Sequence, residues 1–301
     1  MIKGTYIFKE NGIEVGRSEN IITNFGKNAI LRSLANGTNE WGAAIAVGGI
    51  NTAESSSDLS LYYEFTRTPI SLKSYQYSTT SDPNLIIVKG SLDSSITGNI
   101  YEIGVFPSGT SQIFGTRDSL IVEDFSNLNN WSTVSGTTYS TNTYAAGSPY
   151  SPRFGFNSIV MPAGSIIRNN VYSINLSSYS TVDTLDILAN VSTGKSGTLS
   201  VTLTDVNGLT STFASYVFGS VTGYQIISLP LPLSIFNLST ISSIQISTSG
   251  TNSEITLDVI KISIKAEITS TSAITSRSVL TNPIAKNYGV PLDIEYYLQL
   301  V

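Results

Sequence analysis

Runs of alternating hydrophobic and polar residues, separated by turn-forming residues, dominate this chain. In the clearest run, residues 198–204, Thr or Ser alternates with Leu or Val, which predicts a strand with one buried face and one face in water. Similar runs recur about every 8–12 residues through the middle of the chain, a spacing typical of an antiparallel β-sandwich. The expected strands there are residues 121–125, 137–144, 153–160, 165–176, 183–192, 197–204, 210–218, 223–229, 241–248 and 254–264.

The first third of the chain also reads as mainly β. Asn11-Gly12 lies between two alternating runs within residues 3–22 and predicts a tight hairpin turn. The closing segment, residues 292–300, alternates as well, so we expect it to pair inside the same sheet as the N-terminal strands. Further strands are expected at residues 61–77, 84–92 and 99–106, with a last one near 111–117.

One segment of the first third has the pattern of a helix. Thr23 or Asn24 is a suitable N-cap, and Asn36-Gly37 is a suitable left-handed end. Between them, the spacing of Ile30, Leu31 and Leu34 predicts an apolar face.

Two similar segments suggest a domain inserted into another. Phe114-Gly115-Thr116-Arg117-Asp118-Ser119-Leu120 resembles Ile274-Thr275-Ser276-Arg277-Ser278-Val279-Leu280, and the sandwich pattern lies between them. Surface loops tolerate such insertions, because few buried backbone bonds cross them. We therefore expect a discontinuous host domain, residues 1–119 plus 269–301, and an inserted jelly-roll-like sandwich, residues 120–268.

Composition narrows the classes of function. Only 12% of the 301 residues are charged, about half the usual share, while 41% are hydrophobic. An uncharged polar surface of this kind is typical of secreted and virion β-proteins. The net charge is −5 without any Lys/Arg cluster, which argues against nucleic-acid binding.

Targeting signals are not evident either. No run approaches the roughly 18 apolar residues of a membrane-spanning helix, so membrane insertion is not expected. The first residues lack the apolar core and the cleavage site of a signal peptide.

The residue types also argue against an enzyme. The chain has no histidine and no cysteine, which removes His-based triads, thiolate chemistry and the commonest metal ligand. Carboxylate-pair hydrolysis needs only two facing acids, but no spacing pairs the acids of the sandwich, so we expect no catalytic residues. These acids are Glu123, Asp124, Asp183, Asp186, Asp205, Glu254 and Asp258.

Two further charged positions lie in the host domain. Glu64 and Arg67 are three apart in an expected strand, so we expect their side chains on opposite faces and without direct contact. Asp58, just before Leu59, is expected to be a turn or cap residue.

The host segments resemble a module of tail and other virion proteins of tailed bacteriophages. In that pattern an arginine and a "PI-K" segment follow the "EIG-F" strand almost directly, whereas about 150 residues intervene here. The resemblance implies other virion proteins and copies of this chain as partners. It rests on Asn20-Ile21-Ile22-Thr23, Ala44-Ile45-Ala46-Val47-Gly48-Gly49, Asp58-Leu59, Leu61, Glu64, Arg67, Glu102-Ile103-Gly104-Val105-Phe106, Asn282-Pro283-Ile284-Ala285-Lys286 and Leu292-Asp293-Ile294-Glu295-Tyr296.

The inserted segment resembles jelly-roll carbohydrate-binding modules. The opening Ile121-Val122-Glu123-Asp124-Phe125-Ser126 with Trp131-Ser132 and the closing Ile255-Thr256-Leu257-Asp258-Val259-Ile260-Lys261-Ile262 are similar to the first and last strands of that group. The resemblance implies a structural Ca²⁺ shared by Glu123, Asp124 and Asp258, because this hard cation prefers oxygen ligands. The alternative is that all three are ordinary solvated carboxylates, and no other cofactor is expected.

The same resemblance implies a host-surface glycan as ligand. Aromatic rings offer sugars an apolar face, and loops on a rigid scaffold often carry binding residues. The loop from Tyr144 to Pro152 concentrates aromatics outside any core pattern, so Tyr144, Tyr150 and the following Phe154 are the candidate contacts.

Two interpretations of the whole chain follow. In the first, it is a structural component of a tailed-phage virion, in the tail, baseplate, fibre or head decoration, whose sandwich binds host-surface glycan without catalysis. In the second, the sandwich is a cement that binds only neighbouring virion subunits. Both place the protein in the extracellular particle. A secreted glycan-active enzyme is disfavoured by the absence of a leader and of histidine.

Overall fold

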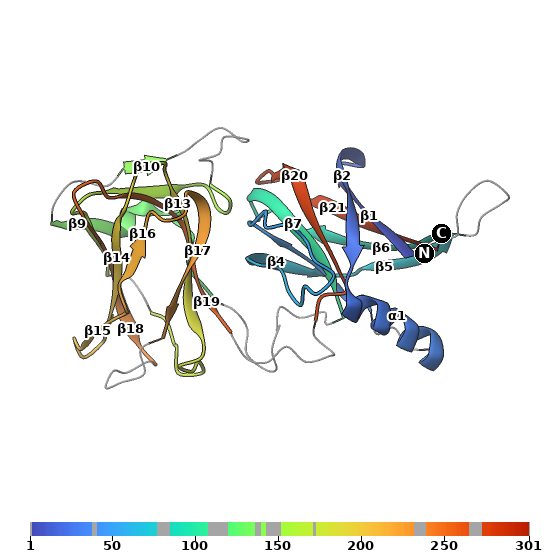
Figure 1. Cartoon of the computed structure of the whole chain (residues 1–301), viewed down its shortest axis with the longest axis horizontal. Coiled ribbons are helices and arrows are strands. Elements are labelled where there is room, and N and C mark those ends of the chain that lie inside the picture. Colours follow the sequence, from blue (N-terminus) through green and yellow to red (C-terminus); the bar gives the residue numbers. More distant parts are fainter. Residues whose placement is uncertain are drawn as a thin grey trace. The chain divides into compact units, whose positions relative to one another are not determined.

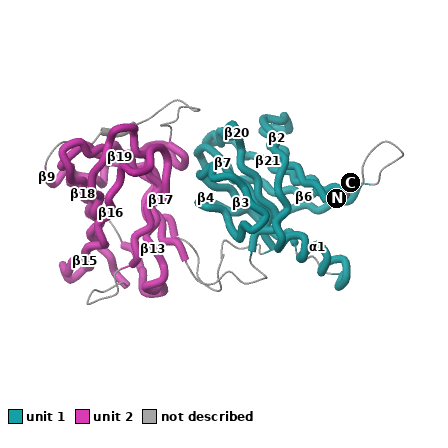
Figure 2. Tube along the Cα trace, viewed as in Figure 1, with its two compact units in different colours: residues 1–114, 267–301 teal, residues 115–266 magenta. Residues whose placement is uncertain are grey.

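The computed structural model describes residues 2–37, 41–76, 85–107, 120–135, 140–142, 152–170, 173–231, 239–264 and 273–300. The chain divides into two compact units (Figure 2): unit 1 is residues 1–114 with 267–301, and unit 2 is residues 115–266. The sequence pattern predicted boundaries at 119/120 and 268/269, five and two residues further along the chain.

Unit 1 is a curled antiparallel sheet (Figure 1), in the strand order β4-β3-β7-β20-β2-β1-β21-β6-β5. The strands at the two ends of this order follow each other in the chain, separated only by Ile70 and Ser71. The sheet therefore bends back on itself. Its strands are β1 (Ile2–Glu10), β2 (Ile13–Ile22), β3 (Ala44–Gly48), β4 (Glu64–Pro69), β5 (Leu72–Gln76), β6 (Leu85–Leu92), β7 (Gly98–Phe106), β20 (Ser276–Lys286) and β21 (Leu292–Leu300).

Two local predictions in unit 1 are confirmed. Asn11 and Gly12 connect β1 and β2 with φ angles of 50° and 80°, the left-handed conformations that a two-residue hairpin turn requires. The terminal strand β21 pairs with β1 on one side and β6 on the other. The core of the unit includes the stacked rings of Tyr6 and Tyr296, whose centroids lie 4.7 Å apart, and the buried Trp41.

Helix α1 (Asn24–Asn36) has the predicted ends but not the predicted apolar face. Thr23 caps it by accepting a hydrogen bond from the Gly26 backbone N–H at 2.9 Å, and Gly37 ends it with a φ of 67°. Ile30 is buried, whereas Leu31 and Leu34 are 60% and 76% exposed.

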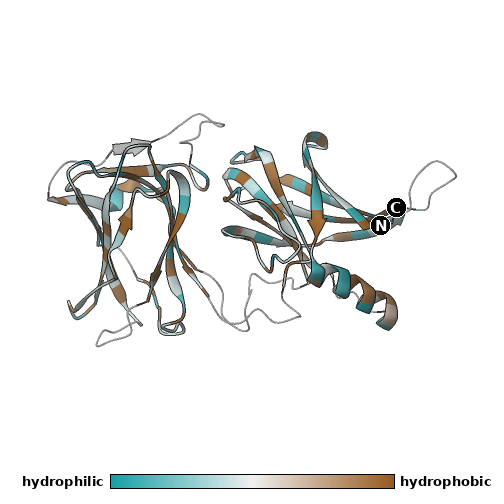
Figure 3. Cartoon of the chain, in the orientation of Figure 1, coloured by the Kyte–Doolittle hydropathy of each residue, from teal (hydrophilic) through white to brown (hydrophobic). Residues whose placement is uncertain are grey.

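The exposed leucines follow from how α1 attaches. Its first turn packs on the segment before β20: the Thr23 hydroxyl donates to the Ile274 carbonyl at 2.6 Å, and Gly26 lies directly against the Thr275 carbonyl. The second half extends away from the strands (Figure 1), and apolar residues colour its end (Figure 3).

The expectation that Glu64 and Arg67 do not touch is wrong. Arg67 donates through Nε and Nη2 to both carboxylate oxygens of Glu64, at 2.9 and 2.8 Å. The register of β4 against β3 pairs Thr66 with Val47 but Glu64 with Gly48, which leaves Phe65 as an extra, bulged residue. A bulge shifts the alternation of side chains by one position, so residues three apart share a face.

A second ion cluster in unit 1 includes two fully buried residues, Arg277 and Glu102. Arg277 on β20 donates to Glu102 on β7 at 2.9 and 3.2 Å and to Asp58 at 2.9 Å. It also donates to the carbonyls of Thr52 and Ala53. Asp58 holds a turn as expected, since it accepts the Ser55 backbone N–H, and it is also an ion-pair partner.

Unit 2 is the expected antiparallel sandwich, with its core between two sheets. One sheet has the order β10-β11-β19-β13-β17, with β8 paired to β19; the other has the order β15-β14-β18-β12-β9, with β16 paired to β14. The elements are β8 (Leu120–Glu123), the short helix η1 (Leu128–Asn130), β9 (Trp131–Ser135), β10 (Ser140–Asn142), β11 (Ser158–Pro162), β12 (Ile166–Asn169), β13 (Thr184–Val191), β14 (Gly197–Asp205), β15 (Thr210–Thr212), β16 (Tyr216–Phe218), β17 (Gly223–Pro230), β18 (Ile241–Ser249) and β19 (Glu254–Ser263).

Both units bring the two ends of the insertion together. In unit 1, Val105 near the end of β7 is the register partner of Ser276 at the start of β20. In unit 2, the first strand β8 pairs with the last strand β19, with Leu120 opposite Ile262. The insertion therefore replaces the loop of a β7–β20 hairpin.

Candidate functional site

The two sheets of unit 2 differ on their outer faces. Strand β14 alternates between buried and half-buried residues, which confirms the prediction of one wet face. Strand β13 is buried from Leu185 to Val191, although only every second residue faces the core. The outer face of the β13 sheet is therefore covered, and it is the polar residues on it that identify a candidate site.

The covered face carries charged and amide side chains. Asp186 and Asn190 lie on β13 between core residues, with exposed fractions of 3% each. Their register partners on β19 are Lys261 and Thr256, both also buried. We call Asp186, Asn190, Thr256 and Lys261 the polar face.

A cation–aromatic pair lies at one end of the polar face. Tyr224 on β17 is the register partner of Asn190, which in turn is opposite Thr256. The Arg153 guanidinium carbon lies 4.2 Å from the centre of the Tyr224 ring. Arg153 is buried and Tyr224 is half-buried, so this pair and the polar face form one continuous polar surface.

The predicted acidic cluster begins with a tight turn after β8. Glu123 accepts hydrogen bonds from the Phe125 backbone N–H at 2.7 Å and from Trp131 Nε1 at 3.2 Å. Phe125 has a φ of 53°, which is rare for an aromatic residue, and its buried ring packs on Trp131. Glu123 therefore holds the strained turn that carries Asp124.

Asp258 is the buried member of the cluster. It is the extra residue of a bulge in β19 and accepts the Arg153 backbone N–H at 2.6 Å and that of Phe154 at 3.5 Å. Burial raises the pKa of the Asp258 carboxyl to about 8; the two N–H donors and the Arg153 charge oppose this rise, and Asp124 adds to it by repulsion. Asp124 lies against Gly155, the residue that follows Phe154, so both carboxylates approach the same short segment.

Two of the three predicted glycan contacts, Tyr144 and Tyr150, fall outside the described residues. Phe154 is half-buried beside Asp258. Of the other aromatics in the sandwich, Tyr179 and Tyr216 pack against the core and Phe156 is half exposed.

Sequence reasoning overlooked the polar face and the Arg153–Tyr224 pair. The sequence does carry one signal for the polar face. Asp186 and Asn190 interrupt an otherwise apolar strand, and because they are four positions apart they share a face of the sheet. No spacing links Arg153 to Tyr224, since tertiary structure alone brings them together.

The remaining candidate acids serve local structure. Asp183 accepts from the backbone and hydroxyl of Ser180, and Asp205 accepts the N–H groups of Asn207 and Leu209. Glu254 forms an ion pair with Lys195, at 3.6 Å.

Among the described residues, no group of three or more His, Cys, Asp or Glu side chains is placed to hold a metal ion. No helix in this part of the chain has the length and hydropathy needed to span a bilayer.

Comparison with known proteins gives partial structural likenesses. The chain is similar to a family 11 carbohydrate-binding module from Clostridium thermocellum, in complex with a β-1,3-1,4-mixed-linked tetrasaccharide, at 15% identity and a TM-score of 0.36, over 50% of this chain and 97% of that one. It is similar to an exo-β-agarase at 17% identity and a TM-score of 0.37, over 50% and 25% of the two chains.

It is also similar to the enzymatically active domain of tailspike protein 4 from bacteriophage CBA120, at 15% identity and a TM-score of 0.31, over 46% and 20% of the two chains. No family model matches the sequence. No curated protein matches it either.

Proposed function

We propose that this chain is a structural component of a tailed-phage virion in which unit 1 anchors the protein and unit 2 binds host-surface glycan without catalysis. The observation that carries the glycan proposal is the polar face with its Arg153–Tyr224 pair. Sugars present hydroxyls and apolar ring faces, and here the half-buried ring of Tyr224 is open to solvent, with buried carboxylate, amide, ammonium and hydroxyl groups beside it. The virion role rests on the sequence resemblance of the unit 1 segments.

Four acids of unit 2, Asp183, Asp186, Asp205 and Glu254, have partners that support binding without turnover. Hydrolysis by a carboxylate pair needs two acids on either side of one bond. Asp183 and Asp205 are engaged in turns, and Glu254 is paired with Lys195. Asp186 faces Lys261 as its register partner, an arrangement suited to holding polar groups.

The affinity of one site is expected to be low. An aromatic ring stacked on a sugar contributes about 1 kcal/mol to the free energy of binding. Together with a few hydrogen bonds, this gives a dissociation constant in the millimolar to high micromolar range. Symmetric assembly of many copies would raise the effective affinity through avidity.

The test is affinity electrophoresis of the full chain in gels that contain soluble polysaccharides, including mixed-linked β-glucan, xylan and the exopolysaccharide of a host strain. Retardation by at least one polysaccharide is expected, with loss in Tyr224→Ala. The control Tyr75→Ala changes an exposed tyrosine on β5 of unit 1 and is expected to keep full retardation.

Two results would overturn the proposal. If no polysaccharide retards the chain, and the chain instead binds purified virion subunits, the cement role replaces glycan binding. If reducing ends accumulate during incubation with a polysaccharide, the protein is an enzyme.

We also propose that Asp124 and Asp258 share a structural Ca²⁺, with Glu123 fixing the turn beside them. Their mutual repulsion and the burial of Asp258 disfavour two bare carboxylates, and a cation would relieve both effects. The Asp124 carbonyl lies close to Gly155, where a Cβ would stand 2.9 Å from its oxygen, so the site has a backbone oxygen nearby as well.

A further inference from the structure

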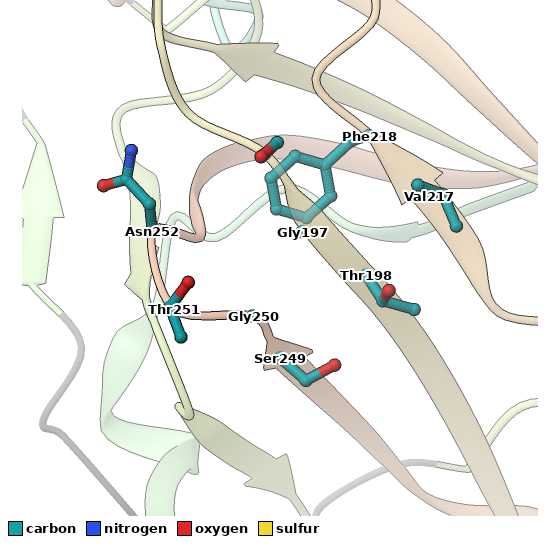
Figure 4. A pocket seen from close by; sticks show the side chains of 9 residues that line it. Gly197, Thr198, Val217, Phe218, Ser249, Gly250, Thr251 and Asn252 are labelled. Atoms are coloured by element: carbon teal, nitrogen blue, oxygen red, sulfur yellow. The ribbon is translucent and has the colours of Figure 1, made fainter.

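A second concave site lies in unit 2, on the sheet that does not carry the polar face. It is a pocket of about 320 Å³ lined by residues 196–198, 217–218 and 249–252 (Figure 4). In Figure 4 the side chains of Ser249, Thr251 and Asn252 lie along one side of the space, and Thr198, Val217 and Phe218 lie along the other. The volume is at the lower end of the roughly 300–1,000 Å³ typical of small-molecule sites.

Two glycines let the segments around the pocket pack closely. Gly250 has a φ of 118°, a conformation that side chains rarely adopt. A Cβ on Gly250 would stand 3.2 Å from the Gly197 Cα, and one on Gly197 would collide with Ser253 and the Ser249 carbonyl. Backbone therefore forms one wall, where a ligand would approach peptide groups directly.

The chemistry of the lining is neutral and rich in hydroxyls. None of the nine lining residues is charged. The nearest charges in sequence, Lys195 and Glu254, pair with each other. The amide nitrogen of Asn252 donates to the Gly194 carbonyl at 2.7 Å, which orients this side chain. Such a site suits an uncharged ligand with several hydroxyls, whereas phosphate or a metal ion would need charged partners.

A buried serine lies beside the pocket but does not line it. Ser253 follows the lining residue Asn252, lies against Gly197 and is 3% exposed. Its hydroxyl has no hydrogen-bond partner among the described residues and is hidden from solvent, so a ligand in the pocket would not contact it. The site is therefore defined by the residues that line the pocket.

We propose that this pocket binds a single terminal sugar, as a second glycan site separate from the polar face. The lining supplies hydroxyls, an amide and peptide groups, and Val217 with Phe218 adds an apolar wall. The choice of a sugar as ligand rests on the proposed glycan-binding function, whereas the site itself rests on the pocket and its uncharged, hydroxyl-rich lining.

The test is backbone-amide NMR of the full chain with methyl glycosides of glucose, galactose, mannose, rhamnose and N-acetylglucosamine. Each is added at about 10 mM, enough to fill most of a millimolar site. At least one glycoside is expected to shift the amide signals of Gly197, Gly250 and Thr251. Thr251→Trp, at an exposed rim position, is expected to weaken this binding at least about tenfold.

Two further variants keep the test decisive. Thr210→Trp places the same ring on an exposed site of β15 and is expected to leave the affinity unchanged. Ser253→Ala removes the buried hydroxyl beside the pocket and is expected to raise the melting temperature of the free chain without changing its affinity for the glycoside.

The outcomes separate this inference from the proposed function. If no glycoside shifts the pocket amides while polysaccharide retardation still depends on Tyr224, the second site is refuted and the glycan function stands. If the pocket amides shift in wild type and in Thr251→Trp alike, the sugar binds elsewhere and the inference fails. Shifts that are lost in Thr251→Trp and kept in Thr210→Trp support it, even if Tyr224→Ala has no effect in the gel.

Discussion

Removing the buried guanidinium of Arg277 is expected to destabilise unit 1 alone. Arg277→Met keeps a long apolar stem but leaves Glu102, which is fully buried, with only the backbone N–H groups of Tyr62 and Tyr63 as donors. Burial already raises the pKa of Glu102, and the charge of Arg277 opposes that rise. Breaking a buried ion pair by removing one partner costs about 3–5 kcal/mol.

The chain offers a separate fluorescent reporter for each unit. It has two tryptophans, Trp41 in the core of unit 1 and Trp131 in the core of unit 2. In a Trp131→Phe background, urea unfolding followed by fluorescence therefore reports unit 1 only. With a urea dependence of about 1–3 kcal/mol per molar, Arg277→Met is expected to lower the Trp41 midpoint by about 2 M.

A double-mutant cycle tests the assignment to the ion pair. In Arg277→Met/Glu102→Gln neither ionised partner remains, so the loss is expected to be smaller than the sum of the two single losses. The Trp131 transition, measured in a Trp41→Phe background, is the matched control and is expected not to move. Additive single losses, or a change of less than about 1 kcal/mol in Arg277→Met, would refute the reasoning.

Three further predictions concern the helix, the insertion and the metal. A Gly-to-Ala change inside a helix usually stabilises it by up to about 1 kcal/mol, but Gly26→Ala is expected to lower the urea midpoint of unit 1, because the added Cβ would collide with the Thr275 carbonyl. The control Lys27→Ala, at the next, exposed position, is expected to change the free energy of unfolding by less than about 0.5 kcal/mol. Deleting residues 115–266 and closing the gap with a short Gly/Ser linker is expected to leave a cooperative unit 1 transition, and its absence would contradict the insertion model. Calcium is expected to raise the melting temperature of the chain relative to chelator, but not in Asp258→Asn; identical curves for the wild-type chain would exclude the shared ion.

The features predicted well from the sequence are those fixed by local backbone chemistry. Asn11-Gly12 form the hairpin turn because both residues tolerate positive φ. Thr23 begins the helix because its hydroxyl accepts a backbone N–H of the first turn, and Gly37 ends the helix because it adopts a left-handed conformation. The alternation in β14 shows its buried face directly.

The errors occur where a partner strand decides the outcome. The bulge at Phe65 depends on how β4 pairs with β3, and it brings Glu64 and Arg67 together against simple alternation. The exposed Leu31 and Leu34 likewise depend on how far α1 reaches beyond the sheet. The periodicity of a sequence describes a single strand or helix. The register of a strand and the docking of a helix depend on a second element as well, so periodicity alone cannot predict them.

The residues of the candidate site also fall into a group that the sequence predicted and a group that it did not. Glu123, Asp124 and Asp258 were singled out by the resemblance to carbohydrate-binding modules, in which the opening and closing segments carry such acids, and β8 does pair with β19. Whether they bind calcium remains a prediction. The Arg153–Tyr224 pair joins residues far apart in the sequence, with no shared pattern.

The pairing of chain ends explains why one chain holds two folds. A domain can be inserted into a hairpin without disturbing it under two conditions. The two strands that flank the insertion must be neighbours in the sheet, and the first and last strands of the inserted domain must lie side by side. Val105 with Ser276 meets the first condition, and Leu120 with Ile262 meets the second. The ion cluster of Arg277, on the returning strand β20, then ties that strand to Glu102 on the departing strand β7. Unit 1 is thus held by contacts of its own on both sides of the insertion, so changes on the surface of unit 2 would not disturb them.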